Sequence, residues 1–512
     1  MAAEVGDRTA YDAGRAALDA RRWHEAADLL DAAAVEDPSG AVLEALGTAC
    51  FWTDRPDTIA VRERAYNAYR AARDPYGAAR VATALAWDHL TFRGEESVAR
   101  GWLRLAARSL DGQPVSAEHG HLALWEADFA LDGADLVTAD EQATRAAAIG
   151  RTLEDNDIEL LALAQQGLVR LLRGEVDAGM QLLEATAVAA TAGEIADPAY
   201  AGYACCYLIT ACHEVRDVGR AGEWCAKLDE HCERAGFHAL QQVCRTEYAG
   251  VLVEQGEWER AEQEMLTAVD VLADKRPPMV AGPLVRLGEL RRRQGRMEEA
   301  TELFARGEGH ALSVLGLGAI ALDEGRPDEA QHAAERYLRQ HAPGDRIGRF
   351  RGLELLVHAS AAAGDVSGAQ APLQELRETV ATLRGGTMVA AAHHAEAAVL
   401  LAAGDRAGAR RAAEDAVSHY ERAGAAFGAG QAQALLQRAT GETDVPASER
   451  LITPREADVL RLVAEGLSNA AIAERLHLSE HTVHRHVANV LTKLDVATRA
   501  AAVAKAAGHG LL

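Results

Sequence analysis

Residues 452–503 read ITPREADVLRLVAEGLSNAAIAERLHLSEHTVHRHVANVLTKLDVATRAAAV, and this stretch decides the fold at the carboxyl end of the chain. Thr453 can cap a helix, Pro454 fits the first helical position, and Glu456 can bond back to the cap. Apolar residues then recur at helical spacing until Gly466, which tolerates the left-handed backbone that ends many helices. The stretch therefore opens with a short amphipathic helix.

Two further helices are expected after this glycine. Ser468 or Asn469 can cap the second helix, and Ser479 can cap the third, with Glu480 near the positive end of the helix dipole. The turn between them is short, so the two helices must cross steeply, as in a helix-turn-helix. The third helix has a narrow apolar arc that we expect to face the core, made of Val483, Val487, Val490, Leu491 and Leu494.

The opposite face of the third helix has no aliphatic side chain larger than alanine. In a major groove, arginine can read guanine and asparagine can read adenine, while threonine and lysine can hold phosphates. Together with the caps and the short turn, this pattern favours a DNA-reading helix over an ordinary solvated face. The face and its edges comprise His481, Thr482, His484, Arg485, Ala488, Asn489, Thr492 and Lys493.

The stretch resembles the LuxR/FixJ/NarL-type DNA-binding domain over about an eighth of the chain, with these features in family order: TPRE, EGLSN, IAERL, SEHTV, His486, NVLTKL and Arg499. The resemblance implies four helices, of which the third reads DNA and the fourth commonly supports dimerisation on inverted half-sites. It makes His484 and Arg485 the expected base readers, and it places Thr482 and Lys493 nearer the phosphates. The full set of expected DNA-binding residues is His481, Thr482, His484, Arg485, Ala488, Asn489, Lys493 and Arg499.

The stretch also departs from the family pattern. His484 stands where the family usually has lysine, and Asp495 replaces a common glycine. Other polar positions of the family are occupied here by Ala470, Ala471, Ala497 and Ala500. These changes predict a weaker affinity for phosphates than is usual in the family. A second reading stays open, in which the closely spaced His477, His481 and His484 bind a metal or sense pH.

Charge divides the chain into two unequal parts. The 512 residues carry a formal net charge of −24, whereas residues 450–512 contain eight Lys/Arg and six Asp/Glu, a net +2. The remainder therefore carries −26 and should repel DNA, so specific contacts must direct DNA binding. Neither a secretory signal nor a run of eighteen apolar residues occurs, so we expect a cytoplasmic protein that does not enter the membrane.

The long amino-terminal part repeats a pattern of small, glycine, bulky, small and bulky positions. The clearest copy is residues 245–269, RTEYAGVLVEQGEWERAEQEMLTAV, with Ala249, Gly256, Trp258, Ala261 and Met265 at these five positions. Each unit reads as a helical hairpin, and stacked hairpins bury a continuous core. The pattern resembles the tetratricopeptide repeat. Other copies are centred on Gly94, Gly174, Gly295, Gly325, Gly364 and Gly404.

The predicted organisation is all-α: a tetratricopeptide-like α-solenoid over residues 1–439, a polar linker over 440–450, and a four-helix LuxR-type helix-turn-helix domain over 451–512. The linker should let the DNA reader move. Five tryptophans of the solenoid are expected mainly in its core, and the alternative is that they line a ligand groove: Trp52, Trp87, Trp102, Trp125 and Trp224.

Six of the seven cysteines lie between Cys205 and Cys244. Cys205 and Cys212 are seven residues apart, as are Cys225 and Cys232, so each pair should lie on one side of a helix. In a cytosolic protein they are expected to be reduced and to pack as small apolar residues. A thiol sensor is the alternative.

The sequence predicts a regulator and not an enzyme. It has no Gly-Lys pair for a phosphate-binding loop and no pattern of a phosphoacceptor domain. Candidate catalytic pieces such as His393 and His394, or Glu298 and Glu299, lack companion motifs. We expect a transcriptional regulator with no cofactor and no metal, acting as a homodimer on promoter DNA and working with RNA polymerase. Its repeats would sense or dock an unknown protein or small-molecule ligand. The alternative is a protein-interaction scaffold that does not bind DNA.

Overall fold

The computed structural model describes residues 2–235, 238–381, 383, 385–441, 452, 454–476 and 478–508. These residues form helices and turns with no β-strand among them, so the all-α prediction is confirmed. The amino-terminal elements are α1 (Ala2–Asp19), α2 (Trp23–Glu36), α3 (Gly40–Trp52), α4 (Thr58–Ala72), α5 (Pro75–Asp88), η1 (His89–Arg93), α6 (Glu96–Leu110), α7 (Ala117–Asp132), α8 (Leu136–Leu153), α9 (Asn156–Leu172) and α10 (Val176–Ala192).

The middle of the chain continues in the same way. Its elements are α11 (Pro198–Glu214), α12 (Val218–Ala235), α13 (His238–Gln255), α14 (Trp258–Lys275), η2 (Pro277–Val280), α15 (Ala281–Arg293), α16 (Met297–Arg306), α17 (Ala311–Asp323), α18 (Pro327–Leu338), α19 (Arg346–Ala362), α20 (Val366–Val380), α21 (Thr387–Ala402), α22 (Arg406–Arg422) and α23 (Ala426–Thr440). The last four helices are α24 (Pro454–Ala464), α25 (Asn469–Leu476), α26 (Glu480–Lys493) and α27 (Arg499–Gly508).

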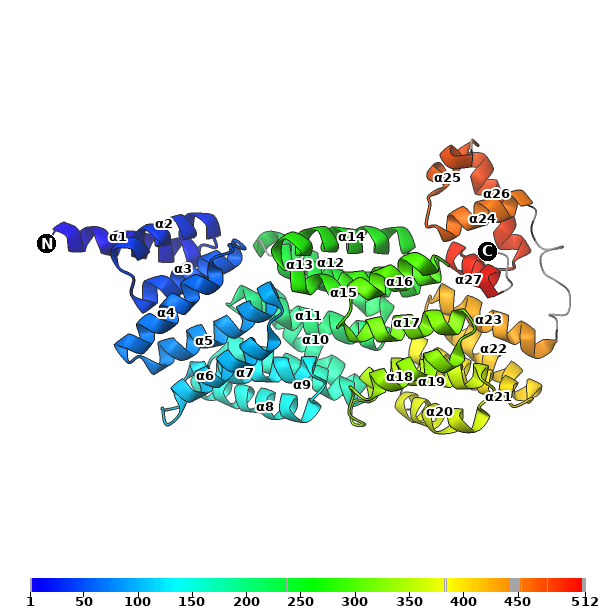
Figure 1. Cartoon of the computed structure of the whole chain (residues 1–512), viewed down its shortest axis with the longest axis horizontal. Coiled ribbons are helices and arrows are strands. Elements are labelled where there is room, and N and C mark those ends of the chain that lie inside the picture. The colour runs from blue at the N-terminus through cyan, green and yellow to red at the C-terminus, as the bar shows by residue number, and fades with distance from the viewer. Residues whose placement is uncertain are drawn as a thin grey trace.

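Helices α1 to α23 form a tetratricopeptide-like solenoid of antiparallel hairpins (Figure 1). Each helix packs against the next, and the odd-numbered helices also contact one another, from α1 with α3 to α21 with α23. The odd-numbered helices therefore line the inner face, and the even-numbered helices form the outer layer.

The solenoid turns back on itself. Helix α13 contacts α23, α9 contacts α19, and η1 contacts η2. Arg276, the residue before η2, is 4% exposed. Its Cζ lies 3.7 Å from the ring centroid of Phe92, and its Nη2 donates to a carboxylate oxygen of Asp54 at 2.7 Å. A buried guanidinium over an aromatic face is a strong contact, so Arg276 stabilises the packing of η2 against η1 and the turn after α3.

The repeat positions predicted from the sequence take the expected places. Gly256 has a φ of +84° in the turn between α13 and α14, where a side chain would be strained. Trp258 is 6% exposed, and Ala261 and Met265 are fully buried. The small residues allow the helices to approach, and the large ones fill the groove beyond them. Of the five tryptophans expected in the core, Trp224 is buried, and the others are half-buried and pack against the core: Trp52, Trp87, Trp102 and Trp125.

The expectation that all cysteines are reduced is wrong for one pair. Cys206 of α11 and Cys244 of α13 form a disulfide, with their Cα atoms 5.5 Å apart. Sequence spacing along one helix does not reveal this contact, because it joins two inner helices that are neighbours in space. Cys205, Cys212 and Cys225 are buried thiols, and the side chain of Cys232 lies outside the described residues.

The domain of four carboxyl-terminal helices packs on the end of the solenoid through α27 (Figure 1). Helix α27 lies against α23 as well as against α24 and α26 of its own domain. Small residues make this contact close: a Cβ added to Gly430 of α23 would lie 2.9 Å from the Cβ of Ala504. The domain is thus docked in this structure. The mobility expected from the sequence stays a prediction. Of the predicted linker over 440–450, all but Thr440 and Gly441 lies outside the described residues.

Candidate nucleic-acid interface

The three helices expected from the motif form at the predicted places. Helix α24 is followed by Gly466 with a φ of +80°. Ser468 caps α25, since its Oγ accepts from the N–H of Ala471 at 3.2 Å, and the Oγ of Ser479 accepts from the N–H of Thr482 at 3.1 Å. The predicted caps are confirmed at both helices, while Thr453 lies outside the described residues.

The predicted core face of α26 is confirmed. Val483 is fully buried, Val490 is 2% exposed and Leu494 is 1% exposed, and they pack with Val459 and Ile472 of the preceding helices. This packing fixes the rotation of α26 about its axis. The opposite face must therefore point away from the domain core.

That opposite face is exposed and polar. The structure brings together four of the predicted residues as exposed side chains on one face of α26: His484, Arg485, Ala488 and Asn489. Within the described part of the chain, Arg485 has no ion pair, so its guanidinium is available to a base edge or a phosphate. Thr482 lies at the start of this face, half-buried, with its Oγ1 2.7 Å from the Oγ of Ser479.

Two of the predicted basic residues also have partners inside the protein. The Nζ of Lys493 lies 2.6 Å from Oε2 of Glu456, a carboxylate that is only 3% exposed. Arg499 lies on α27, where it donates to the backbone oxygen of Leu467 and lies 3.8 Å from a carboxylate oxygen of Glu259 in the solenoid. The structure therefore does not bring Arg499 to the face formed by Arg485 and Asn489.

His481 begins the exposed face in the sequence, but its side chain and all of His477 lie outside the described residues. The metal alternative for these histidines thus stays a prediction. Among the residues that the structure describes, no group of three His, Cys, Asp or Glu has the arrangement of a metal site. No described helix is long and apolar enough to cross a membrane.

We expect Ser479→Ala to destabilise α26 locally by about 1 kcal/mol, because the N–H of Thr482 loses its capping acceptor. Hydrogen exchange of the α26 amides should become about fivefold faster, which is that free energy expressed as a rate ratio. Ser418→Ala, at an exposed position inside α22, is the matched control. Equal exchange in both variants would show that the cap does not hold this helix.

Sequence reasoning missed the residues that dock the domain. Gly430 and Gly256 face Ala504 and Ala500 of α27, and a Cβ added to Gly256 would lie 2.6 Å from the Cβ of Ala500. The sequence feature that could have indicated this contact is the frequency of alanine and glycine in α23, which begins AFGAGQAQALL. Such a composition permits a close helix contact on a second side.

Comparisons with known proteins agree with this geometry. Residues 450–506 match the family described as bacterial regulatory proteins, luxR family. A protein of Mycobacterium bovis named as an HTH-type transcriptional regulator is 47% identical over 88 residues, which are 17% of this chain and 10% of that protein. The nitrate/nitrite response regulator protein NarL of Escherichia coli is 47% identical over 62 residues, which are 12% of this chain and 27% of NarL.

The chain thus spans about a tenth of the length of the mycobacterial relative. Among solved structures, the APC/C hetero-tetramer Cut9-Hcn1 is 13% identical with a TM-score of 0.45, covering 98% of this chain and 96% of that one. A tetratricopeptide repeat protein of Parabacteroides merdae is 15% identical with a TM-score of 0.28, covering 63% of this chain and 99% of that one. On the family match and the geometry of α24 to α27, residues 450–506 are a helix-turn-helix domain of the luxR family of bacterial regulatory proteins.

Proposed function

We propose that this protein is a sequence-specific transcriptional regulator that reads promoter DNA with α26, and that its solenoid controls the reader. The observation that carries the proposal is the exposed face of α26, where Arg485 and Asn489 stand one turn apart. Arginine and asparagine are the side chains that pair bidentately with guanine and adenine. The core packing of Val483 and Val490 fixes these side chains outward.

The proposed control acts through the fourth helix. In this structure the residues of α27 from Ala500 to Ala506 are buried, and Val503 and Ala506 are fully so. In the luxR-type family this helix commonly supports dimerisation, so a homodimer formed in that way requires α27 to leave α23. The docked arrangement is then the restrained state, and the undocked arrangement binds inverted half-sites.

The negative charge of the solenoid also disfavours DNA binding by the docked domain. The chain outside residues 450–512 carries −26, and the docked reader lies beside it. A polyanion that approaches the docked reader meets this repulsion, whereas an undocked reader can move away from it. DNA binding should therefore be strongly sensitive to whether the solenoid holds the reader.

The test is selection of binding sites from a random duplex pool with the full-length protein, followed by titration of the selected duplex against salt. We expect an inverted repeat to be enriched and the affinity to fall as salt rises, because the protein neutralises phosphates. The absence of any enriched sequence would contradict the proposal and would favour a protein-interaction scaffold.

A further inference from the structure

The inner face of the solenoid lines a partly open cavity of about 300 Å³, which is at the lower end of the size range of small-molecule sites. It is lined by α13, α15, α17 and α19, by the start of α23, by single residues of α11, α16, α21 and α22, and by Arg216 between α11 and α12. One part of its wall is apolar, with Val253, Leu312 and Leu315. Another part carries arginines, glutamates and histidines, and most of these charges pair with one another.

Most carboxylates in the cavity wall already accept hydrogen bonds from arginines. Glu254 pairs with Arg293 at 2.6 Å, and Arg216 pairs with Glu354 at 2.5 Å. Burial alone would raise the pKa of Glu254, but Arg293 and Arg216 outweigh it and lower this pKa to about 2. These carboxylates are ionised and already occupied, so the wall offers few acceptors to a ligand.

Two arginines of the cavity wall, Arg286 and Arg351, each have a buried N–H group without an acceptor. Arg286, 7% exposed, donates to Glu247 and to the backbone oxygen of Gly282 through its two terminal nitrogens. Arg351 donates from Nη2 to the backbone oxygen of His213 at 3.1 Å. The Nε atoms of both are buried without a hydrogen-bond acceptor among the described residues, and the nearest carboxylate oxygen to that of Arg351, on Glu214, is 3.8 Å away.

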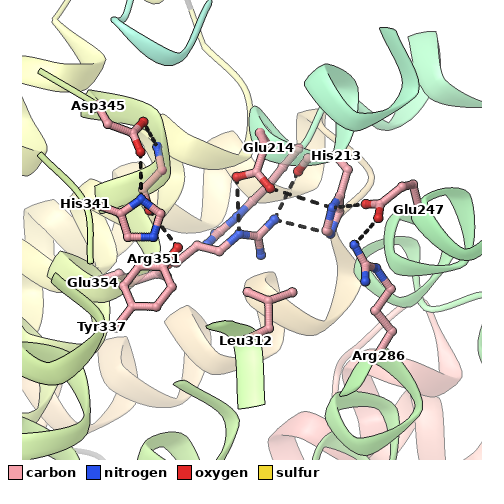
Figure 2. A network of polar contacts seen from close by, with 12 residues as sticks. His213, Glu214, Glu247, Arg286, Leu312, Tyr337, His341, Asp345, Arg351 and Glu354 are labelled. Atoms are coloured by element: carbon pink, nitrogen blue, oxygen red, sulfur yellow. Dashed lines mark hydrogen bonds and ion pairs between the residues drawn. The ribbon is translucent and has the colours of Figure 1, made fainter. Parts of the chain in front are cut away.

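His213 lies between these two arginines (Figure 2). Its Nδ1 is 2.9 Å from a carboxylate oxygen of Glu247, and its Nε2 is 3.3 Å from the Nη2 of Arg351. Burial and the nearby Arg351 lower the pKa of His213, so the ring is neutral. The ring therefore adds no positive charge, and the guanidinium N–H groups without an acceptor at this corner are the Nε–H groups of Arg286 and Arg351.

Gly250 lets α13 pack closely against His213 at this corner. A Cβ added there would lie 2.9 Å from the Nε2 of His213 and 3.5 Å from the Nε of Arg286. Gly250 lines the cavity, as do His213, Arg286 and Arg351. Leu312 lies on another side of the same corner (Figure 2).

We propose that this cavity binds a small monocarboxylic acid with an apolar body, its carboxylate meeting the Nε–H groups of Arg286 and Arg351 and its body lying against Leu312 and Leu315. A buried guanidinium N–H without an acceptor is costly, and a carboxylate supplies acceptors for two of them. Glu247 and Glu214 already balance much of the positive charge of the two arginines, so a monoanion suits this corner better than a dianion such as phosphate. The body must be compact to fit the volume.

The cavity also reaches the helix that docks the reader. Phe427, Gly428 and Gln431 of α23 line the cavity, while Gly430 of the same helix contacts α27. A ligand that changes the position of α23 would shift the docking equilibrium. This coupling rests on the proposed function, whereas the binding of the acid does not.

The test is calorimetric titration of the full-length protein with 4-methylpentanoate, phenylacetate and indole-3-acetate, and with phenylacetamide and inorganic phosphate as comparisons. We expect one site per chain for at least one of the acids and at least tenfold weaker binding of phenylacetamide and phosphate. Arg351→Gln and Gly250→Ala should each weaken binding of that acid at least tenfold. Gly282→Ala is the matched control, since its Cβ would meet Arg286 and Thr246 at ordinary contact distances of 3.7 and 3.8 Å.

Failure of all three acids to bind, or equal binding of the amide or of phosphate, would overturn the proposal. Unchanged affinity in Arg351→Gln and Gly250→Ala, with both variants folded by circular dichroism, would overturn it as well. A second titration measures the affinity for the selected duplex with and without the acid. Acid binding with unchanged DNA affinity would support the site and contradict its coupling to the reader, and a lack of DNA binding would contradict the proposed function alone.

Discussion

Arg485→Gln combined with Asn489→Ala is expected to weaken binding to the selected duplex by about 100-fold or more. Each bidentate pairing with a base edge contributes about 1–3 kcal/mol of discrimination, and the double variant removes two of them. Both side chains are exposed on α26, so the domain should keep its stability. The measurement is a pair of binding titrations, with the selected duplex and with a scrambled duplex of the same composition.

The comparison between the two duplexes separates base reading from phosphate binding. Affinity for the scrambled duplex should fall much less, because phosphate contacts carry no sequence information. Arg151→Gln, an exposed change on α8 of the solenoid, is the charge-matched control and should leave both affinities unchanged. An equal loss on both duplexes would mean that α26 does not read bases.

Gly430→Leu is expected to tighten DNA binding of the full-length protein by roughly tenfold. The added side chain meets Ala504 and the backbone of Ala501 across the α23–α27 contact, and such overpacking costs about 1–3 kcal/mol. That cost falls on the docked arrangement only, so the equilibrium moves toward the free reader. The affinity for the selected duplex and the sedimentation coefficient of the complex provide the measurement.

This variant changes no residue of the DNA-binding domain. Gly101→Leu in α6 is the matched control, because no atom lies within 4 Å of a Cβ added there. It should leave DNA affinity unchanged. Weaker DNA binding in Gly430→Leu with intact folding would mean that the docked arrangement is the DNA-binding form.

The local structure of the solenoid hairpins and of the helix-turn-helix could be predicted from the sequence. Positions such as Trp258 and Met265 follow from a short repeated pattern, and the caps Ser468 and Ser479 follow from residue type and spacing. These features depend on interactions within a few residues of one another. They could therefore be predicted without knowledge of how the hairpins stack.

The contacts between distant turns could not be predicted in this way. The disulfide of Cys206 with Cys244 and the meeting of Arg286 with His213 depend on which inner helices become neighbours. That neighbourhood is set by small rotations between hairpins, summed along the solenoid. The ion pair of Lys493 with the buried carboxylate of Glu456 could not be predicted either, because it depends on how α24 and α26 pack within the domain.

Hydrogen exchange of the α23 amides, with and without the selected duplex, tests the release of the reader most directly. In the free protein, α27 covers the face of α23 that carries Gly430, so these amides should exchange slowly. We predict that they exchange faster when the duplex is bound, because α27 has then left α23. Unchanged protection of α23 in the DNA complex would contradict the account, since it would show that the docked reader binds DNA.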